Sequence, residues 1–142
     1  GYWPDNKTLE WMRDQGMRSY EMTEIHHRGL TAVLDESFAT LTNECDGVFL
    51  SVDIDVVDPG MAPGTGTPEP GGMTSRELLE AVRRICLELP IVGIDVVEVA
   101  PAFDSADITA ILANRVVLEA LSAIAKRRSG APYSPTQNLL DR

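Results

Sequence analysis

Apolar residues recur along this chain with two different periods, which separate predicted helices from predicted strands. Two near-continuous apolar runs, GVFLSVDI at 47–54 and IVGIDVVEV at 91–99, have strand length and are typical of strands covered on both faces. In other segments apolar residues recur three and four positions apart, which predicts a buried helical face. The predicted helices are 5–15, 24–44, 74–89 and a last one ending near Arg128, and a short strand is predicted at 17–22.

Residues that cap helices mark where several of these helices begin. Thr74 and Glu77 have the spacing of a capping box, in which each satisfies a backbone N–H group of the first turn. Thr23 is expected to cap the helix over 24–44, and Ser105 or Asp104 the last helix. The residues expected to face the core are Leu30, Val33, Leu34, Phe38 and Leu41 in the second helix, Leu78, Leu79, Val82, Ile85, Cys86 and Leu89 in the third, and Ile108, Ile111, Leu112, Leu118 and Leu121 in the last.

The order of the predicted elements, βαβαβα, predicts the fold class. Apolar strands joined by right-handed helical crossovers form a parallel sheet with helices on both faces, so we expect an α/β fold. Residues 56–73 hold four prolines and five glycines and are predicted to form a loop. A loop of this length within a compact domain is usually functional or disordered.

Composition and charge narrow the possible functions. The chain has 142 residues, enough for one domain with a core, and a net charge of −10 from 22 acidic and 12 basic residues. This charge argues against nucleic acid or an anionic membrane as a partner, since both attract a cationic surface. We recognise neither a signal peptide nor an apolar run near the ~20 residues of a membrane span. Cys45 and Cys86 are expected to be buried free thiols in a reducing compartment, so we expect a cytoplasmic protein.

Two aspartates stand where the first apolar run ends. Asp53 and Asp55 are two positions apart, which on a strand places both side chains on one face, about 6.6 Å apart at the backbone. Two such carboxylates repel each other unless a positive group lies between them, and a hard divalent cation supplies that charge. The other interpretation is that they cap a helix or pair with Arg or Lys. Asp58, just before Pro59, is predicted to shape the loop as a turn residue.

The other acidic residues and the two histidines are weaker candidates for a catalytic or binding role. Asp95 precedes Glu98 by three positions, so a regular strand would place it on the other face, where an ion pair or a backbone hydrogen bond is expected. Glu69 has two open roles, in stabilising the loop or in sensing the far end of a substrate. His26 and His27 lie early in a predicted helix and are expected on the solvated surface.

The letters DIDVV also fit a second class of enzyme. Haloacid-dehalogenase-type phosphatases place DxDx(T/V) after an apolar strand, with the first Asp attacking phosphorus. That chemistry needs a cationic group for the phosphate, usually a lysine. The lysines here, Lys7 and Lys126, lie away from the predicted strand ends, which counts against this alternative.

Three motifs in order resemble one family over most of the chain. SVDIDVVDP, APGTGTPEPGG and GIDVVEVAP closely resemble the signature series of the ureohydrolases, the arginase and agmatinase superfamily. GTGTPEPGG and EMTEIHHRGL look more like the agmatinase branch. The resemblance covers residues 1–128 and leaves 129–142 as a carboxyl-terminal extension. It implies a three-layer α/β/α fold with a mainly parallel sheet.

The resemblance also implies an activity and roles for three residues. Members of this superfamily use two Mn²⁺ ions bridged by a hydroxide that attacks a guanidinium carbon, releasing urea and an amine. By this match Asp53 would bridge both metals and Asp55 would bind one of them through both oxygens. Glu98 matches the carboxylate that holds the substrate guanidinium. A small linear guanidino substrate, agmatine or 4-guanidinobutanoate, and a homo-oligomer (trimer or hexamer) are implied as partners.

The chain departs from the family pattern in one large respect. The GGDHS-type and DAHxD-type motifs that supply the other metal ligands are absent, and the chain has only two histidines. The first residue is also not methionine. We therefore expect the carboxyl-terminal half of a longer ureohydrolase, inactive when isolated. A non-catalytic, metal-free scaffold domain stays open as the alternative for the isolated chain.

Overall fold

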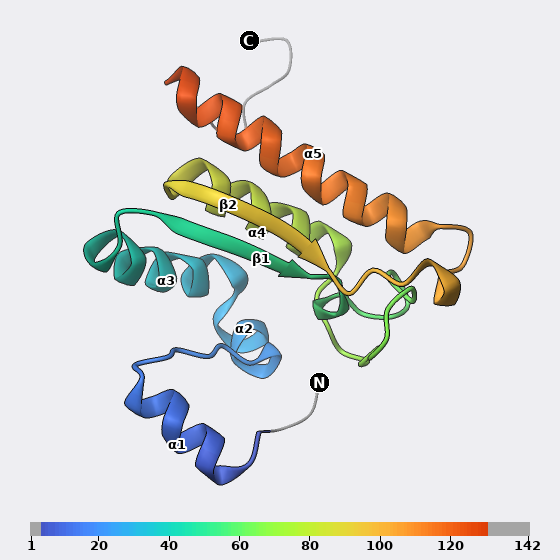
Figure 1. Cartoon of the computed structure of the whole chain (residues 1–142), viewed down its shortest axis with the longest axis horizontal. Coiled ribbons are helices and arrows are strands. Elements are labelled where there is room, and N and C mark those ends of the chain that lie inside the picture. The colour runs from blue at the N-terminus through green and yellow to red at the C-terminus, as the bar shows by residue number, and fades with distance from the viewer. Residues whose placement is uncertain (1–3, 131–142) are drawn as a thin grey trace.

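The computed structural model describes residues 4–130 and contains helices beside a short parallel sheet (Figure 1). The helices are α1 (Asn6–Asp14), α2 (Met22–Arg28), α3 (Leu30–Glu44), α4 (Ser75–Glu88) and α5 (Ile108–Ser129). The strands are β1 (Val48–Asp53) and β2 (Ile91–Val97), and two 3₁₀ turns, η1 (Ile54–Val56) and η2 (Pro101–Phe103), follow their ends.

The sheet confirms the two apolar runs as neighbouring parallel strands. β1 and β2 pair directly, with Val48 opposite Ile91 and Asp53 opposite Val97. The helix between them, α4, begins with the predicted capping box, because Thr74 accepts from the Glu77 backbone and Glu77 accepts from the Thr74 backbone. A parallel pair needs such a crossover, and α4 provides it.

One face of this sheet is covered and the other is open within residues 4–130. Val52 packs with buried residues of α4 and α5, such as Val82 and Val116. Phe49 points to the opposite face, as alternation along a strand requires, and is 61% exposed. Helices on both faces were expected, but α3, α4 and α5 all pack on one side in the described part of the chain. The chain therefore holds part of a layered α/β fold.

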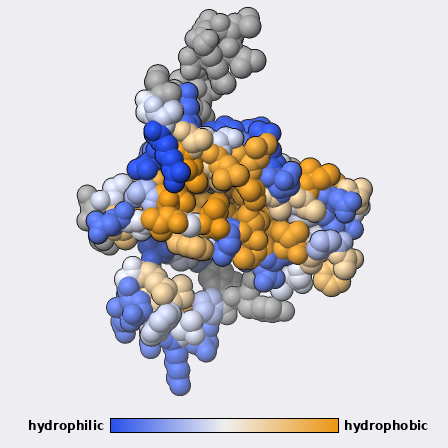
Figure 2. Space-filling view, turned by 45° about the horizontal axis from the view of Figure 1, so that its top comes forward, coloured by the Kyte–Doolittle hydropathy of each residue, from blue (hydrophilic) through white to orange (hydrophobic). Residues whose placement is uncertain are grey.

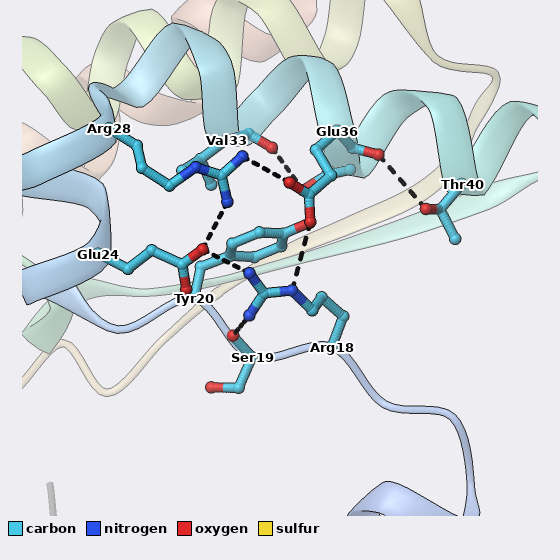
Figure 3. A network of polar contacts seen from close by, with 9 residues as sticks. Arg18, Ser19, Tyr20, Glu24, Arg28, Val33, Glu36 and Thr40 are labelled. Carbon is cyan, nitrogen blue, oxygen red and sulfur yellow. Dashed lines mark hydrogen bonds and ion pairs between the residues drawn. The ribbon is translucent and has the colours of Figure 1, made fainter.

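The segment predicted as a strand at 17–22 is irregular up to residue 21, Met22 already belongs to α2, and a network of ionic side chains holds the segment instead (Figure 3). Arg18 pairs with Glu24 at 2.5 Å, and the Tyr20 hydroxyl donates to Glu36 at 2.9 Å. Arg28 joins the two acids, lying 2.5 Å from each. A strand needs a neighbour for its backbone ladder, and the described residues provide none here. The strand prediction is wrong for this structure.

The helix predicted over 24–44 is divided by a glycine. Gly29 has a φ of 83°, in the left-handed region that favours glycine, and it separates α2 from α3. At its other end α2 begins at Met22 after the N-cap residue Glu21, so Thr23 is not its cap, contrary to the prediction. The prediction of which face of α3 points inward is confirmed at Val33, Leu34 and Phe38, which are buried.

The inner face of α5 differs from the predicted one. Leu112 is buried as expected, but Ile108, Ile111, Leu118 and Leu121 are exposed, and the buried face is instead formed by Thr109, Leu112, Val116, Glu119, Ala120 and Ala123. Apolar residues occupy both sides of this helix, so their period alone does not select the packed side. By length and composition α5 could also cross a membrane, which the sequence analysis had not recognised, yet its inner face packs against α4.

Exposed apolar side chains gather over a broad part of one face of the molecule (Figure 2). The exposed large apolar residues of the described chain include Phe49 of the sheet and Ile111, Leu118 and Leu121 of α5. One cysteine prediction also fails, since Cys45 is exposed while Cys86 is buried; both are free. The predicted extension at 129–142 lies almost wholly outside the described residues.

A buried ion pair joins α4 to α5 and carries a stability prediction. The Arg83 Nε atom lies 2.5 Å from Glu119, which is 7% exposed. Burial alone would raise the pKa of Glu119, but hydrogen bonds and charge from Arg83 and Arg115 outweigh burial and lower it. We expect Glu119→Ala to reduce the free energy of unfolding by about 3 kcal/mol, because it removes the buried partner of a charge. Urea unfolding followed by circular dichroism measures this change.

Glu80 provides the matched control for that substitution. It contacts the same arginine at 3.0 Å but is more exposed than Glu119. Glu80→Ala should therefore cost less than about 1 kcal/mol, as exposed pairs do. Equal losses in the free energy of unfolding from Glu119→Ala and Glu80→Ala would contradict the prediction that the buried pair contributes more than the exposed one.

Candidate functional site

The two aspartates lie at the carboxyl end of β1, but not on one strand. Asp53 is the last residue of β1, and Asp55 lies in the 3₁₀ turn η1. The Asp55 backbone N–H donates to Asp53 Oδ1 at 3.2 Å, so the turn folds the second acid back towards the first. The expected proximity is present, although the turn produces it and strand alternation does not.

Electrostatics connects a third acid, Glu98, to this pair. Partial burial raises the pKa of Asp53, and the negative charges of Asp55 and Glu98 raise it further, against the lowering effect of the Asp55 N–H group. No salt bridge within residues 4–130 joins any of these three acids to a lysine or arginine. The negative charge at this edge of the sheet is therefore not neutralised by a basic side chain of the described chain.

Glu98 owes its position to a break in the extended backbone just after β2. Its φ is 62°, a left-handed conformation that costs a non-glycine residue of order 1 kcal/mol or more. Its carboxylate lies over the loop, where a Cβ built on Gly66 would be 3.8 Å from Glu98 Oε2. In an unbroken strand Glu98 would face the side opposite to Asp95. The strained residue breaks that alternation and lies near the aspartate pair.

Asp95 is exposed on β2, opposite Ser51. Residues 4–130 contain no ion pair or side-chain hydrogen bond made by it, so the structural role expected for Asp95 is not supported. Glu69 is exposed on the loop, and its two proposed roles stay predictions. His26 and His27 are both exposed on α2, which confirms their predicted surface position.

The glycine- and proline-rich loop is closed at its base by Asp58, as predicted for a turn residue. One oxygen of Asp58 accepts from the Gly60 N–H and the other from the Gly71 N–H, both at 2.8 Å. These two bonds hold the pKa of Asp58 below its usual value, and the bond from Gly71 has the larger effect. A side chain at position 72 would clash, because a Cβ there would lie 2.5 Å from the Val56 carbonyl oxygen, so glycine is required. The loop is therefore ordered rather than disordered.

A second anchor attaches the loop to the start of α5. The Gly64 N–H donates to the buried hydroxyl of Thr109 at 2.8 Å, and the Gly64 carbonyl accepts from Ala100. The N-cap residue of α5 is Asp107 and not the predicted Ser105 or Asp104, but the Asp104 side chain still accepts from the Thr109 and Ala110 N–H groups in the first turn. Between the two anchors, the loop contacts Asp55 through Thr67 and lies beside Glu98 at Gly66.

Thr67 is the residue of this site that the sequence analysis did not identify. Its hydroxyl donates to Asp55 Oδ2 at 2.7 Å. A hydroxyl residue within the motif GTGTP, twelve positions after an acid pair, was the available signal, but spacing alone does not show which acid it reaches. Thr67 therefore links the loop directly to one of the candidate ligands.

The donor set suits a hard divalent cation, but it is incomplete within residues 4–130. Carboxylate oxygens are preferred ligands of Mg²⁺, Ca²⁺ and Mn²⁺, and two unneutralised carboxylates favour such an ion. No group of three or more His, Cys, Asp or Glu in the described part is arranged to hold a metal. A hollow of about 450 Å³ lies elsewhere, between α2 and the start of α4, and none of the three acids lines it.

Comparison with known proteins places these residues in a family context. The model of the arginase family matches residues 3–123. Proclavaminate amidinohydrolase from Streptomyces clavuligerus is 43% identical over 129 residues, which are 89% of this chain and 39% of that protein. The agmatinase of Citrobacter koseri is 41% identical over 115 residues, 79% of this chain and 36% of that protein.

Solved structures agree with the sequence matches. Arginase from Bacillus caldovelox superposes with a TM-score of 0.75 at 37% identity, covering 82% of this chain and 39% of that one. Formimidoylglutamase from Bacillus subtilis gives a TM-score of 0.80 at 33% identity, covering 84% and 37%. The chain thus spans well under half the length of the relatives it matches.

Proposed function

This chain belongs to the arginase family, and on that premise we propose that it is the part of a longer ureohydrolase that contributes Asp53 and Asp55 to a binuclear manganese site and Glu98 to the substrate. The observation that carries the proposal is the convergence of these three acids at one sheet edge without a basic partner in the described chain. The family match leaves the phosphatase alternative without support. That the matched region is the carboxyl-terminal half stays a prediction.

Each residue has a defined task in this proposal. Asp53 and Asp55 would hold the cations, and Glu98 would orient the guanidinium, because a carboxylate pairs with that planar group through two parallel hydrogen bonds. Gly66 of the loop lies next to this carboxylate, since a Cβ there would be 3.8 Å from Glu98 Oε2. When bound, manganese supplies the positive charge that activates water for hydrolysis. The remaining ligands would come from the rest of the longer protein.

The substrate proposal is a linear guanidino compound, agmatine or 4-guanidinobutanoate, ahead of arginine. The motif GTGTPEPGG and the agmatinase relatives support this order. We expect the longer protein with Mn²⁺ to release urea fastest from one of the first two compounds. A urea-release assay across the three substrates decides it. Preference for arginine would contradict the proposed specificity, and no urea from any guanidine would contradict the proposed reaction.

The assembly and the location are further proposals. We propose that the longer protein is a cytoplasmic homo-oligomer, a trimer or hexamer, that binds neither nucleic acid nor membranes. The net charge of −10 supports the exclusion of anionic partners, and two free cysteines fit a reducing compartment. Light scattering of the longer protein tests its oligomeric state.

A further inference from the structure

The bond between Thr67 and Asp55 has the features of a fixed, charge-assisted contact. At 2.7 Å it has the usual O–H···O length and falls within the range seen when a carboxylate accepts. The hydroxyl occupies one lone-pair direction of Oδ2. The Thr67 hydroxyl contacts Oδ2, so this bond leaves the other carboxylate oxygen, Oδ1, uninvolved.

The loop holds Thr67 firmly enough to orient that carboxylate. Gly64, three residues earlier, is bonded through its N–H group to a completely buried Thr109 hydroxyl. Pro68, directly after Thr67, restricts the backbone of the residue before it. The branched Cβ of threonine further limits rotation of the hydroxyl. The donor is thus positioned before any ligand binds.

Asp55 needs such a restraint because its own backbone does not supply one. It lies in a short 3₁₀ turn beside Asp53, whose charge repels it. A carboxylate in this position would otherwise rotate away from its neighbour. Residues that hydrogen-bond a metal ligand commonly orient it and raise the affinity of the site.

We propose that Thr67 is a positioning residue, whose hydroxyl holds the Asp55 carboxylate in the orientation that binds the cation. This inference rests on the proposed function, in which Asp55 is a metal ligand. It differs from a purely structural role, in which the bond would only fasten the loop.

The test is a Mn²⁺ titration of the metal-free longer protein, by calorimetry or by electron paramagnetic resonance of free Mn²⁺. Thr67→Val replaces the hydroxyl with a methyl group of similar size, and we expect a loss of roughly 10- to 100-fold in Mn²⁺ affinity. Thr67→Ser keeps the hydroxyl and should restore affinity to within about threefold of wild type. The melting temperature of the metal-free protein should be nearly equal in all three.

Thr65 supplies the matched control within the same loop. Its hydroxyl is buried and has no hydrogen-bond partner in the described part of the chain, so Thr65→Val should leave Mn²⁺ affinity unchanged. Asp55→Asn distinguishes a failure of the positioning role of Thr67 from a failure of the proposed function. If Asp55→Asn weakens binding and Thr67→Val does not, the positioning role is overturned while the proposed function stands. If Asp55→Asn also binds normally, the proposed function fails. A matching loss of melting temperature in Thr67→Val would show a structural role instead.

Discussion

In the longer protein, Asp53→Asn and Asp55→Asn should each lower Mn²⁺ affinity by more than about 100-fold, beyond what an outer-shell residue contributes. The amide keeps the shape of the side chain but removes the negative charge that a hard cation requires. Because the two acids lie side by side without a basic partner among the described residues, either change also removes part of the repulsion that favours cation binding. Metal analysis after dialysis measures the loss of bound Mn²⁺, and a urea-release assay measures the accompanying loss of turnover.

Asp95→Asn is the control for this pair. Asp95 is an exposed acid on the neighbouring strand, outside the group that perturbs Asp53, so its replacement should leave metal content and turnover near wild type. This control excludes a general effect of reduced negative charge at the sheet. Wild-type metal content in both Asp53→Asn and Asp55→Asn would contradict their assignment as ligands.

Glu98→Gln should behave differently from both aspartate variants. If Glu98 binds the guanidinium, losing its charge removes two charge-assisted hydrogen bonds, and kcat/KM should fall by roughly 100- to 1,000-fold. Metal content should stay nearly intact. A metal loss equal to that of the aspartate variants would make Glu98 a ligand instead of a substrate residue.

The sequence predicts the elements well where a local signal is unambiguous. The capping box at Thr74 and Glu77 specifies the start of α4, and both apolar runs became paired parallel strands. Asp53 and Asp55 were predicted as metal ligands because two acids at the end of an apolar run require compensation, and that role stays a prediction. Each of these signals acts over a few residues, and no distant contact competes with it.

Predictions failed where distant contacts decide the outcome. The segment 17–22 has strand-like residues but no neighbouring strand in the described chain, and its side chains form the Arg18–Glu36 network instead. The packed side of α5 depends on α4, because apolar residues such as Leu112 and Leu121 occur on both sides of α5. Thr67 was missed because its partner is twelve residues away across an irregular loop.

The isolated chain of 142 residues should associate with itself, and the cause is apolar surface that residues 4–130 leave open. Phe49 on the open face of the sheet is 61% exposed, and Ile111 on the outer side of α5 is 62% exposed. Each strand also has one edge unpaired within the described residues, which can pair with another chain. In the longer relatives, more than half of the protein lies outside the matched region and is available to cover such surfaces.

The same chain should bind Mn²⁺ weakly and release no urea. Asp53 and Asp55 alone offer too few ligands, and their mutual repulsion is then only partly compensated. Sedimentation velocity, metal analysis and a urea assay on the purified chain test the three expectations. Ile111→Glu and Leu121→Glu should reduce self-association, because each places a charge in the apolar surface, whereas Lys126→Glu, near the end of the same helix, should change it little. A stable monomer that holds two Mn²⁺ and cleaves a guanidine would show that this chain supplies a complete site, and the assignment of Asp53, Asp55 and Glu98 as a partial one would have to be replaced.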